Sequence, residues 1–347
     1  MTSTAPARSG DDARRTRAAV LGTGSWGTTF AAVLADAGCD VTLWGRRAEV
    51  CAEITERGTN EAYLPGVRLP AGVRATPDVA DALRGADVVA VAVPAQTAGA
   101  TLEPLADLVE PGAVVVSLMK GVELSSDRRM SEVVAHALRL PDERVAVVSG
   151  PNLAREIAAR QPTATVVAST SEATAQRVAQ ACASSYFRPY TNTDVVGVEL
   201  CGAVKNIIAV AVGIAQGRGF GHNTMATVIT RGLVEITRLG LALGADAETF
   251  SGLAGMGDLV ATCASPLSRN HTLGVHIGQG MGLADALAAT GGTAEGVKSS
   301  TSVLELAGTV GVEMPITAAV VAVLHDGLPV DRMAQLLLAR PHKAEGL

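Results

Sequence analysis

The sequence predicts an α/β protein in which an N-terminal doubly wound parallel sheet is followed by an all-helical C-terminal domain. Between residues 17 and about 194, short runs that are apolar at nearly every position alternate with amphipathic, helix-like stretches. From 196 to 340 only helix-length patterns occur, separated by Gly and Pro. Strands that are apolar throughout are buried on both faces, and their alternation with helices is typical of a parallel sheet.

The apolar runs place the expected strands at 18–22, 40–44, 87–93, 113–118, 144–149 and 163–169. The expected helices between them include 27–37, 97–109, 126–139 and 171–183. We expect four parts along the chain, namely a disordered tail over 1–16, a sheet domain over 17–195, a helical domain over 196–340 and a short C-terminal tail over 341–347.

Composition and charge restrict the class of protein. The 347 residues are 48% hydrophobic and 18% charged, which suits two globular domains and excludes disorder as the main state. The formal net charge of −6 argues against a nucleic-acid partner, which would require a basic face. If the substrate is an anion, a few individual Lys and Arg side chains must bind it.

Several common features are not expected. The five cysteines are scattered and lack a Cys-x-x-Cys pair, so they indicate reduced thiols, with neither disulfides nor zinc. The spacing of the six histidines does not suggest a metal site. The charged N-terminus is followed by no apolar stretch, and no apolar run reaches about 18 residues, so we expect a soluble, cytoplasmic protein without a membrane anchor.

A glycine pattern follows the first expected strand. Gly22, Gly24 and Gly27 form G-x-G-x-x-G at the start of a helix. The first glycine permits the tight turn, the second allows a pyrophosphate to approach the backbone, and the third allows close packing of helix and strand. In this strand–turn–helix context, the pattern predicts a Rossmann-type site for a dinucleotide.

The end of the second expected strand indicates which dinucleotide is used. NAD enzymes place a carboxylate there against the ribose 2′-hydroxyl, whereas this chain has Arg46 and Arg47 and no carboxylate before Glu49. Because guanidinium groups suit a 2′-phosphate, we expect NADPH to be preferred, or accepted alongside NADH. The alternative interpretation is a solvated helix start with two surface arginines.

A lysine lies within an apolar stretch of the second half. Lys205 falls in GVELCGAVKNIIAVAVGIAQG (197–217), where an unpaired ammonium would cost several kcal/mol. Reduction of a ketone by hydride leaves an alkoxide that needs a proton donor, and a partly desolvated lysine can act both as this acid and as the base of the reverse reaction. The alternatives are a snorkelling lysine or a structural ion pair.

The chain resembles the bacterial NAD(P)-dependent glycerol-3-phosphate dehydrogenases from residue 18 to about 338. Ten blocks carry this resemblance in family order: GTGSWGTTFA (22–31), NEAYLPG (60–66), KGVE (120–123), GPNLAREIA (150–158), GVELCGAVKNIIAVAVGI (197–214), FGHNT (220–224), TRGLVEITRLG (230–240), FSGLAGMGDLVATCAS (250–265), SRN (268–270) and EGVKS (295–299). It implies interconversion of dihydroxyacetone phosphate and sn-glycerol 3-phosphate for phospholipid synthesis, by a homodimer that uses no metal.

The resemblance also implies a role for each matching residue. Lys205 corresponds to the proton donor and acceptor, and Asp258 to the carboxylate that orients it or a substrate hydroxyl. The implied substrate contacts are Lys120, Gly150, Asn152, Lys205, Asp258 and the phosphate-binding Ser268, Arg269 and Asn270. The implied cofactor contacts beyond the glycines and the arginine pair are Ser25, Trp26, Lys120, Ala154, Arg269 and Glu295.

Five positions depart from the usual family pattern, and two rival functions compete with it. The departures are Leu118-Met119, Asn152, Leu153 and His222. One rival is a hydroxyacid or 6-phosphogluconate type of dehydrogenase, which also joins such a sheet to a helical domain bearing a lysine. The other is a redox-sensing dinucleotide-binding module, which would need neither Lys205 nor the Ser-Arg-Asn block.

Overall fold

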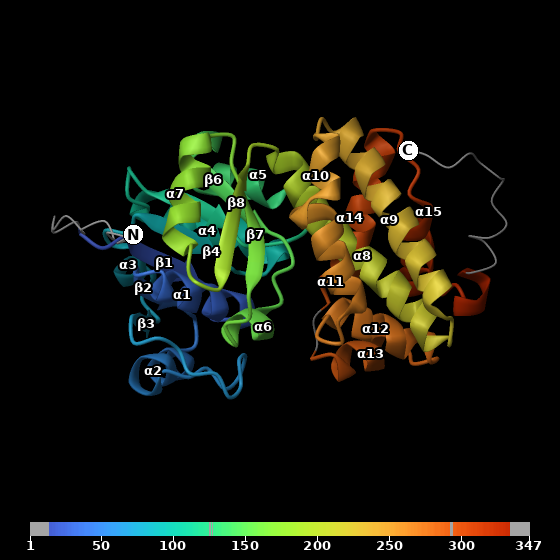
Figure 1. The fold of residues 1–347 in the computed structure, drawn as a ribbon, viewed down its shortest axis with the longest axis horizontal. Helices are drawn as coiled ribbons and strands as arrows, with labels where there is room; N and C mark the ends of the chain where they lie inside the picture. Colours follow the sequence, from blue (N-terminus) through green and yellow to red (C-terminus); the bar gives the residue numbers. More distant parts are fainter. Residues whose placement is uncertain (1–13, 125, 127, 292–293, 334–347) are drawn as a thin grey trace, which may run out of the picture.

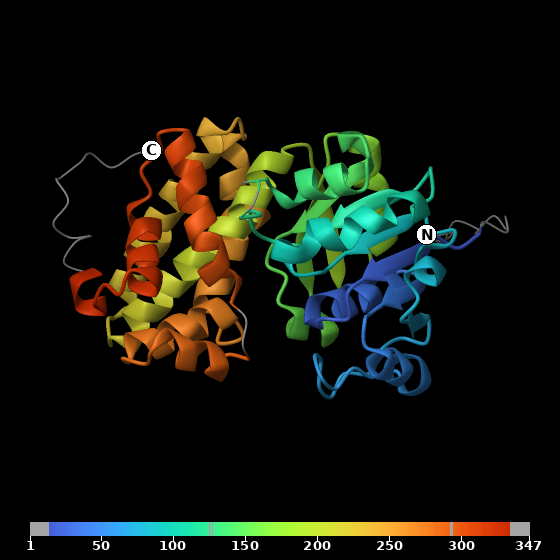
Figure 2. The same cartoon turned by 180° about the vertical axis from the view of Figure 1, so that it is seen from behind.

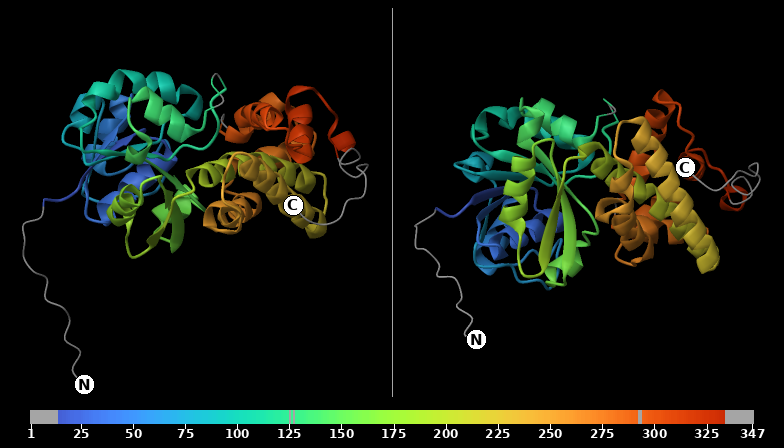
Figure 3. Two further views of the ribbon diagram at one scale, coloured as in Figure 1. Left: turned by 90° about the horizontal axis from the view of Figure 1, so that it is seen from above. Right: turned by 45° about the horizontal axis from the view of Figure 1, so that its top comes forward.

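The protein has two parts, a sheet covered by helices and a bundle of helices beside it (Figure 1). The computed structural model describes residues 14–124, 126, 128–291 and 294–333. Most of the N-terminal tail predicted over 1–16, and all of the C-terminal tail predicted over 341–347, lie outside these residues. The same two-part arrangement is seen from above in Figure 3.

An eight-stranded sheet forms the first part, in the order β3-β2-β1-β4-β5-β6-β7-β8. All neighbouring pairs are parallel except β6 and β7, which are antiparallel. The strands are β1 Arg17–Leu21, β2 Asp40–Trp44, β3 Val73–Thr76, β4 Val88–Val91, β5 Val114–Ser117, β6 Val145–Ser149, β7 Thr163–Ala168 and β8 Phe187–Asn192.

The six strands expected from the sequence are confirmed, but β3 and β8 were missed. Both are edge strands in which only the first residue is buried, and β8 contains Pro189. Edge strands need not be apolar on both faces, so the pattern that identified the central strands is absent from them. The expectation of a parallel sheet is wrong for β7, which runs against β6.

Helices cover both faces of the sheet. Alternate residues of β1 point to opposite sides, since Ala18 and Val20 join one core cluster while Ala19 and Leu21 join another. The first face carries α1 Ser25–Asp36, α6 Ala154–Ala158 and α7 Glu172–Cys182 (Figure 1). The second carries α4 Ala98–Leu102, η2 Glu103–Leu108 and α5 Met130–Ala137 (Figure 2).

Four short helices complete the sheet part: α2 Ala48–Arg57, α3 Val79–Leu83, η1 Ala95–Thr97 and η3 Asp142–Arg144. The described residues after β8 are helical apart from their connections. Their helices are α8 Val195–Gly217, α9 His222–Ala242, α10 Ala247–Ser251, the π-helix η4 Leu253–Gly257, α11 Asp258–Ala264, α12 Arg269–Gly278, α13 Leu283–Ala289, α14 Glu295–Thr309 and α15 Pro315–His325.

Helix α8 is the centre of the helical part. It packs against α12 through facing glycines, where a Cβ on Gly213 would lie 2.1 Å from the His271 carbonyl oxygen and one on Gly274 2.2 Å from that of Val210. Only glycine permits this approach of two helix backbones. Among the described residues, α8 alone has the length and apolar character of a membrane span, and 89% of its most apolar window is buried inside the protein.

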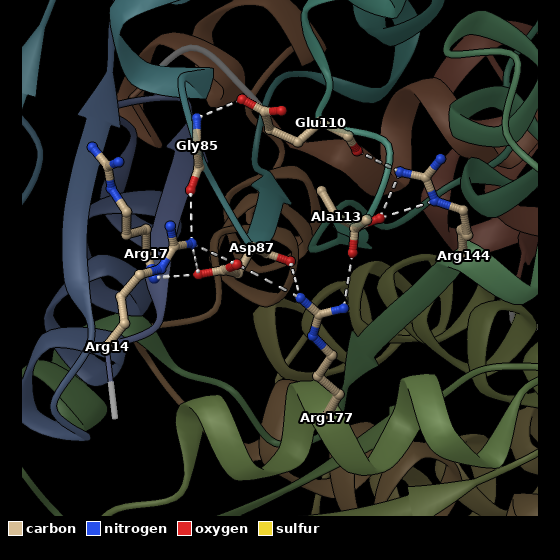
Figure 4. A network of polar contacts seen from close by, with 9 residues as sticks. Arg14, Arg17, Gly85, Asp87, Glu110, Ala113, Arg144 and Arg177 are labelled. Atoms are coloured by element: carbon tan, nitrogen blue, oxygen red, sulfur yellow. Dashed lines mark hydrogen bonds and ion pairs between the residues drawn. The ribbon is translucent and has the colours of Figure 1, made fainter. Parts of the chain in front are cut away.

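A polar network joins the amino-terminal ends of β1 and β4 (Figure 4). The Asp87 carboxylate accepts hydrogen bonds from the Arg17 amide and the Arg14 guanidinium, each at 2.9 Å. The Arg177 guanidinium donates to the Asp87 carbonyl oxygen at 3.1 Å. Burial alone would raise the pKa of Asp87, but these donors outweigh it and hold the pKa below its usual value.

We predict that Asp87→Ala lowers the free energy of unfolding by about 2 kcal/mol, because charge-assisted hydrogen bonds between β1 and β4 are lost. Since the folded-state pKa is depressed, the wild-type advantage is present above about pH 4 and disappears as pH falls through the folded-state value. Urea unfolding at several pH values measures both effects. Asp107→Ala, which removes an exposed ion pair with Arg139, is the control and should change little. Equal stability losses in the two variants would contradict the prediction.

Candidate active site

The glycine turn lies between β1 and α1 and has the geometry that its spacing predicts. Gly22 has a φ of +124°, and a Cβ there would lie 2.5 Å from the Ala92 carbonyl oxygen. A Cβ on Gly27 would lie 2.1 Å from the Gly22 carbonyl oxygen, so this glycine is required for the turn itself. A Cβ on Gly24 would meet no atom within 4 Å. The turn therefore leaves open space at Gly24, which fits the approach of a pyrophosphate.

Asn60 holds this turn by hydrogen bonds from outside it, and no sequence pattern indicated this role. Its side chain is fully buried and donates to the Thr23 carbonyl oxygen at 2.9 Å and to Thr28 Oγ1 at 2.8 Å. Ser25 Oγ donates to the Tyr63 carbonyl oxygen at 2.6 Å. Only membership of the NEAYLPG block distinguished Asn60 in the sequence, because its partners are more than 30 residues away.

Two exposed arginines follow β2 beside the glycine turn. The Arg47 guanidinium lies over the Tyr63 ring, 5.1 Å from its centroid, and Arg47 Nε lies 3.9 Å from Glu49 Oε1. A Cβ on Gly45 would lie 2.4 Å from Thr23 Cγ2, so the end of β2 contacts the turn directly. Arg46 and Arg47 thus present positive charge where a carboxylate would select NADH.

A buried carboxylate joins two lysines at the junction of the two parts. Asp258 is 1% exposed and begins α11, directly after the π-helix η4. Its Oδ1 accepts a hydrogen bond from Lys205 Nζ, and its Oδ2 accepts one from Lys120 Nζ at 2.6 Å. One carboxylate therefore serves two ammonium groups, one from α8 and one from the end of β5.

Each lysine has one further partner. Lys205 Nζ also donates to Thr262 Oγ1 at 2.7 Å, one turn further along α11. Lys120 Nζ donates to the Gly150 carbonyl oxygen at 3.3 Å. A Cβ on Gly202 would lie 3.0 Å from Ser149 Oγ and 3.4 Å from Lys120 Cδ, so this part of α8 lies close to the end of β6 and to the Lys120 side chain. Thr262 was not recognised from the sequence, although its position four residues after Asp258 places it on the same helix face.

Burial lowers the pKa of Lys205, the Asp258 carboxylate opposes this shift, and the positive charge of Lys120 adds to it, so that the resulting pKa is about 8. A group with this pKa can give or take a proton near neutral pH. The Lys205 side chain is only 8% exposed, so the snorkelling alternative is wrong. The ion-pair alternative is correct in that Lys205 pairs with Asp258. With a pKa of about 8, Lys205 can nevertheless still titrate.

The Ser-Arg-Asn block lies at the start of helix α12. Ser268 Oγ caps the helix by accepting a hydrogen bond from the His271 amide at 3.2 Å. Asn270 is buried, and its Oδ1 accepts a hydrogen bond from the Gly296 amide at 2.9 Å. Arg269 is the exposed member of the three, and its guanidinium is carried on the first turn of the helix.

The remaining predicted residues lie either at α1, which follows the glycine turn, or near Lys205. Glu295 Oε2 accepts a hydrogen bond from Asn206 Nδ2 at 3.3 Å, which places Glu295 next to the residue that follows Lys205. The Ala154 carbonyl oxygen accepts a hydrogen bond from Thr29 Oγ1 at 3.3 Å, which places Ala154 against α1. Trp26 packs on Phe30 with its ring centroid 5.6 Å away. Ala154 and Trp26 thus lie at α1, which follows the glycine turn, and Glu295 lies against α8, which carries Lys205.

Asn152 is a departure from the family pattern that lies two residues after Gly150, a hydrogen-bond partner of Lys120. Its Nδ2 donates to Thr165 Oγ1 at 3.0 Å, while its buried Oδ1 has no hydrogen-bond partner among the described residues. Gly150, two residues earlier, has a φ of +142° and contacts Lys120 through its carbonyl oxygen. Among the described residues, no group of His, Cys, Asp and Glu side chains could hold a metal ion.

Comparison with known proteins identifies the family. The family model described as NAD-dependent glycerol-3-phosphate dehydrogenase N-terminus matches residues 17–175, and the one described as the C-terminus matches 194–335. The chain belongs to this family. A glycerol-3-phosphate dehydrogenase [NAD(P)+] of Streptomyces griseus is 61% identical over 329 residues, which are 95% of this chain and 98% of that protein.

Solved glycerol-3-phosphate dehydrogenases share the whole fold. The crystal structure of the enzyme from Coxiella burnetii superposes with a TM-score of 0.89 at 38% identity, over 94% of this chain and 99% of that one. D-mandelate dehydrogenase matches with a TM-score of 0.60 at 13% identity, over 92% of this chain and 99% of that one, and this likeness concerns the fold alone. The family match thus decides against the hydroxyacid-dehydrogenase rival.

We predict that Asp258→Asn lowers the free energy of unfolding by about 3–5 kcal/mol at neutral pH, because the buried Lys205 ammonium and the partly buried Lys120 ammonium lose their counter-charge. The pKa of Lys205 is about 8 in the folded protein and about 10.4 when unfolded, so wild-type stability rises with pH between these values. Without the carboxylate, that rise should begin at a lower pH.

Urea unfolding over a pH series tests this prediction. Asp331→Asn is the matched control, because it removes the carboxylate of an exposed ion pair with Arg218 and should have little effect. If Asp258→Asn were as stable as the wild type, or its pH dependence were unchanged, the shared carboxylate would not support the two lysines.

Proposed function

We propose that this chain interconverts dihydroxyacetone phosphate and sn-glycerol 3-phosphate, with NADPH or NADH as the reductant and Lys205 as the proton donor and acceptor. The observation that carries the proposal is the Asp258 carboxylate shared between Lys120 and Lys205. This arrangement lies at the carboxyl ends of β5 and β6, the edge of a parallel sheet at which ligands of such folds bind.

Bound NADPH or NADH supplies the hydride that reduces the C2 carbonyl carbon of the ketone. The oxygen then needs a proton, and the Lys205 ammonium gives one to form the secondary alcohol. In the reverse direction the neutral Lys205 amine takes the hydroxyl proton. Asp258 keeps the amine oriented, and the Lys120 ammonium stabilises the negative charge that develops on the oxygen.

We propose that the substrate phosphate binds at the start of α12. The Arg269 guanidinium is the exposed positive group there, and a planar guanidinium can hold a phosphate by two hydrogen bonds. Ser268 and Asn270 form the rest of this site with the amides of the first helical turn. Gly150 and Asn152 contact the substrate from the sheet part, next to Lys120.

The cofactor contacts are proposed on both sides of the glycine turn. Gly22, Gly24 and Gly27 shape the pyrophosphate site, and Arg46 and Arg47 face the 2′-phosphate of NADPH. The other proposed contacts are Ser25, Trp26, Lys120, Ala154, Arg269 and Glu295. Nothing in this set requires a metal ion.

Four further expectations remain proposals. The division into domains over 17–195 and 196–340 is supported by the end of β8 at Asn192 and the start of α8 at Val195. A homodimer, a cytoplasmic location and a supply of glycerol 3-phosphate for phospholipid synthesis are supported by the family resemblance.

We predict that Lys205→Met lowers the rate of dihydroxyacetone phosphate reduction by at least about a hundred-fold while NADPH binding persists. Methionine fills the space of the lysine but has no proton to donate. Loss of NADPH absorbance measures turnover, and quenching of protein fluorescence measures NADPH binding. If the wild-type protein does not reduce dihydroxyacetone phosphate, the proposed function is wrong. A near-normal rate in the variant would remove only the lysine from the mechanism.

We predict that replacing both Arg46 and Arg47 by Ala raises KM for NADPH about ten-fold or more and leaves KM for NADH unchanged, because only the 2′-phosphate loses its charged partners. Steady-state rates with each cofactor measure the effect. Arg57→Ala at the end of α2 is the control, and it should affect neither KM. A wild-type enzyme that strongly prefers NADH would contradict the assignment.

A further inference from the structure

The chain that follows Lys120 leaves the sheet part and packs on the helical part. Val122 is fully buried and belongs to the hydrophobic core of the helical part, although β5 ends only a few residues earlier. Gly121 has a φ of +133°, and a Cβ there would lie 3.0 Å from Ser299 Oγ of α14. The described residues 120–123 and 128–131 are named the Lys120 loop below.

The two stretches of the Lys120 loop are held to each other. Val122 forms an isolated antiparallel bridge with Arg129, and the Glu123 amide donates to the Arg128 carbonyl oxygen at 3.0 Å. Gln96 Nε2 donates to the Val122 carbonyl oxygen at 2.8 Å. A displacement of residues 128–131 therefore also displaces Val122 and the neighbouring Lys120.

A second buried carboxylate of α8 holds the far end of this loop. The Glu199 side chain is only 4% exposed. It accepts hydrogen bonds from the Ser131 amide at 2.7 Å, from Ser131 Oγ at 2.5 Å and from the Arg129 guanidinium at 3.0 Å. All three donors come from the Lys120 loop, so these hydrogen bonds of the Glu199 carboxylate join the loop to α8.

The loop thus has two charged attachments to the helical part. Lys120 at its beginning binds Asp258 of α11, and Arg129 and Ser131 at its end bind Glu199 of α8. Helix α8 carries both Glu199 and Lys205. Charge-assisted hydrogen bonds are short and directional, so the second attachment restricts where the loop can lie relative to Lys205.

We propose that Glu199 is a positioning residue for Lys120: by binding Arg129 and Ser131 it holds the Lys120 loop on the helical part, so that both lysines keep a fixed geometry at Asp258. This inference rests on the proposed role of Lys120 in the reaction. Glu199 itself does not touch the reacting atoms. Without this attachment the loop can move with the sheet part, and Lys120 can withdraw from Asp258.

Withdrawal of Lys120 has a consequence that a loss of stability alone would not produce. The ionisable side chains around Lys205 Nζ are Asp258, Lys120 and Cys263. The charge of Lys120 lowers the pKa of Lys205, so its departure raises that pKa. Ketone reduction needs protonated Lys205, and the alkaline limb of its pH profile should therefore move to higher pH.

The chain offers a matched control for this attachment. Glu235 of α9 is also buried, and it accepts hydrogen bonds from the Ile316 amide at 2.6 Å and from the Thr317 amide and hydroxyl at 3.2 Å. It therefore holds the start of α15 as Glu199 holds the start of α5. None of these Glu235 contacts involves the Lys120 loop.

The test compares Ser131→Ala and Glu199→Gln with Thr317→Val and Glu235→Gln in the full-length enzyme. We expect Ser131→Ala and Glu199→Gln to lower kcat for dihydroxyacetone phosphate by about ten-fold or more, since small displacements of catalytic groups are costly. They should move the alkaline limb upward and leave KM for NADPH unchanged. The two controls should lower Tm but alter neither kcat nor the pH profile. If Glu199→Gln fails to fold, Ser131→Ala still tests the inference, because it retains the main-chain hydrogen bond.

Lys120→Ala separates failure of this inference from failure of the proposed function. If Lys120→Ala is impaired while Ser131→Ala behaves like Thr317→Val, the positioning role of Glu199 is wrong and the proposed function stands. If Lys120→Ala turns over normally, the role of Lys120 in the proposed function is itself wrong. A lowered kcat with an upward-shifted alkaline limb in Ser131→Ala supports the inference.

Discussion

The structure depends on one buried carboxylate that neutralises two ammonium groups. Removing these charges from water costs several kcal/mol per ion, and the cost is recovered only when the geometry is good and further hydrogen bonds are made. Thr262 and the Gly150 carbonyl oxygen supply those hydrogen bonds. With both lysines protonated the group carries a net positive charge, which suits a phosphorylated substrate in a protein whose formal net charge is −6.

The fold fixes this group through close contacts of backbone. Gly213 of α8 permits the approach of α12, and Gly202 lies close to Ser149 at the end of β6, so the central helix lies against both its neighbour and the end of the sheet. At the opposite edge, Asp87 and its arginine partners join the amino ends of the strands. Ion pairs and hydrogen bonds thus join the amino ends of the strands, and the candidate active site lies at their carboxyl ends.

Sequence patterns predicted those parts of the fold whose cause is local. The central strands were found because they are buried on both faces, whereas β3 and β8 were missed because an edge strand has one exposed face. The antiparallel direction of β7 is set by pairing with β6, which no local pattern records. Gly22, Gly24 and Gly27 could be assigned because a tight turn restricts the residue type at each of these positions.

Local sequence patterns also could not predict which side chains of the candidate site contact one another. The presence of Lys205 in an apolar helix indicated chemistry, but its pairing with Asp258 joins residues 53 positions apart, and that of Lys120 with Asp258 spans 138. Family resemblance named these residues without explaining why one carboxylate should serve two lysines. The holding of the glycine turn by Asn60 and of the Lys120 loop by Glu199 is apparent only in three dimensions.

A crystal structure of the enzyme with NADP+ and sn-glycerol 3-phosphate tests the central claim most directly. The account predicts that the C2 hydroxyl oxygen lies within hydrogen-bond distance of Lys205 Nζ, that C2 faces the nicotinamide ring, and that Asp258 still joins both lysines. A substrate bound with its C2 hydroxyl remote from Lys205, or with Asp258 turned away from the two ammonium groups, would contradict it.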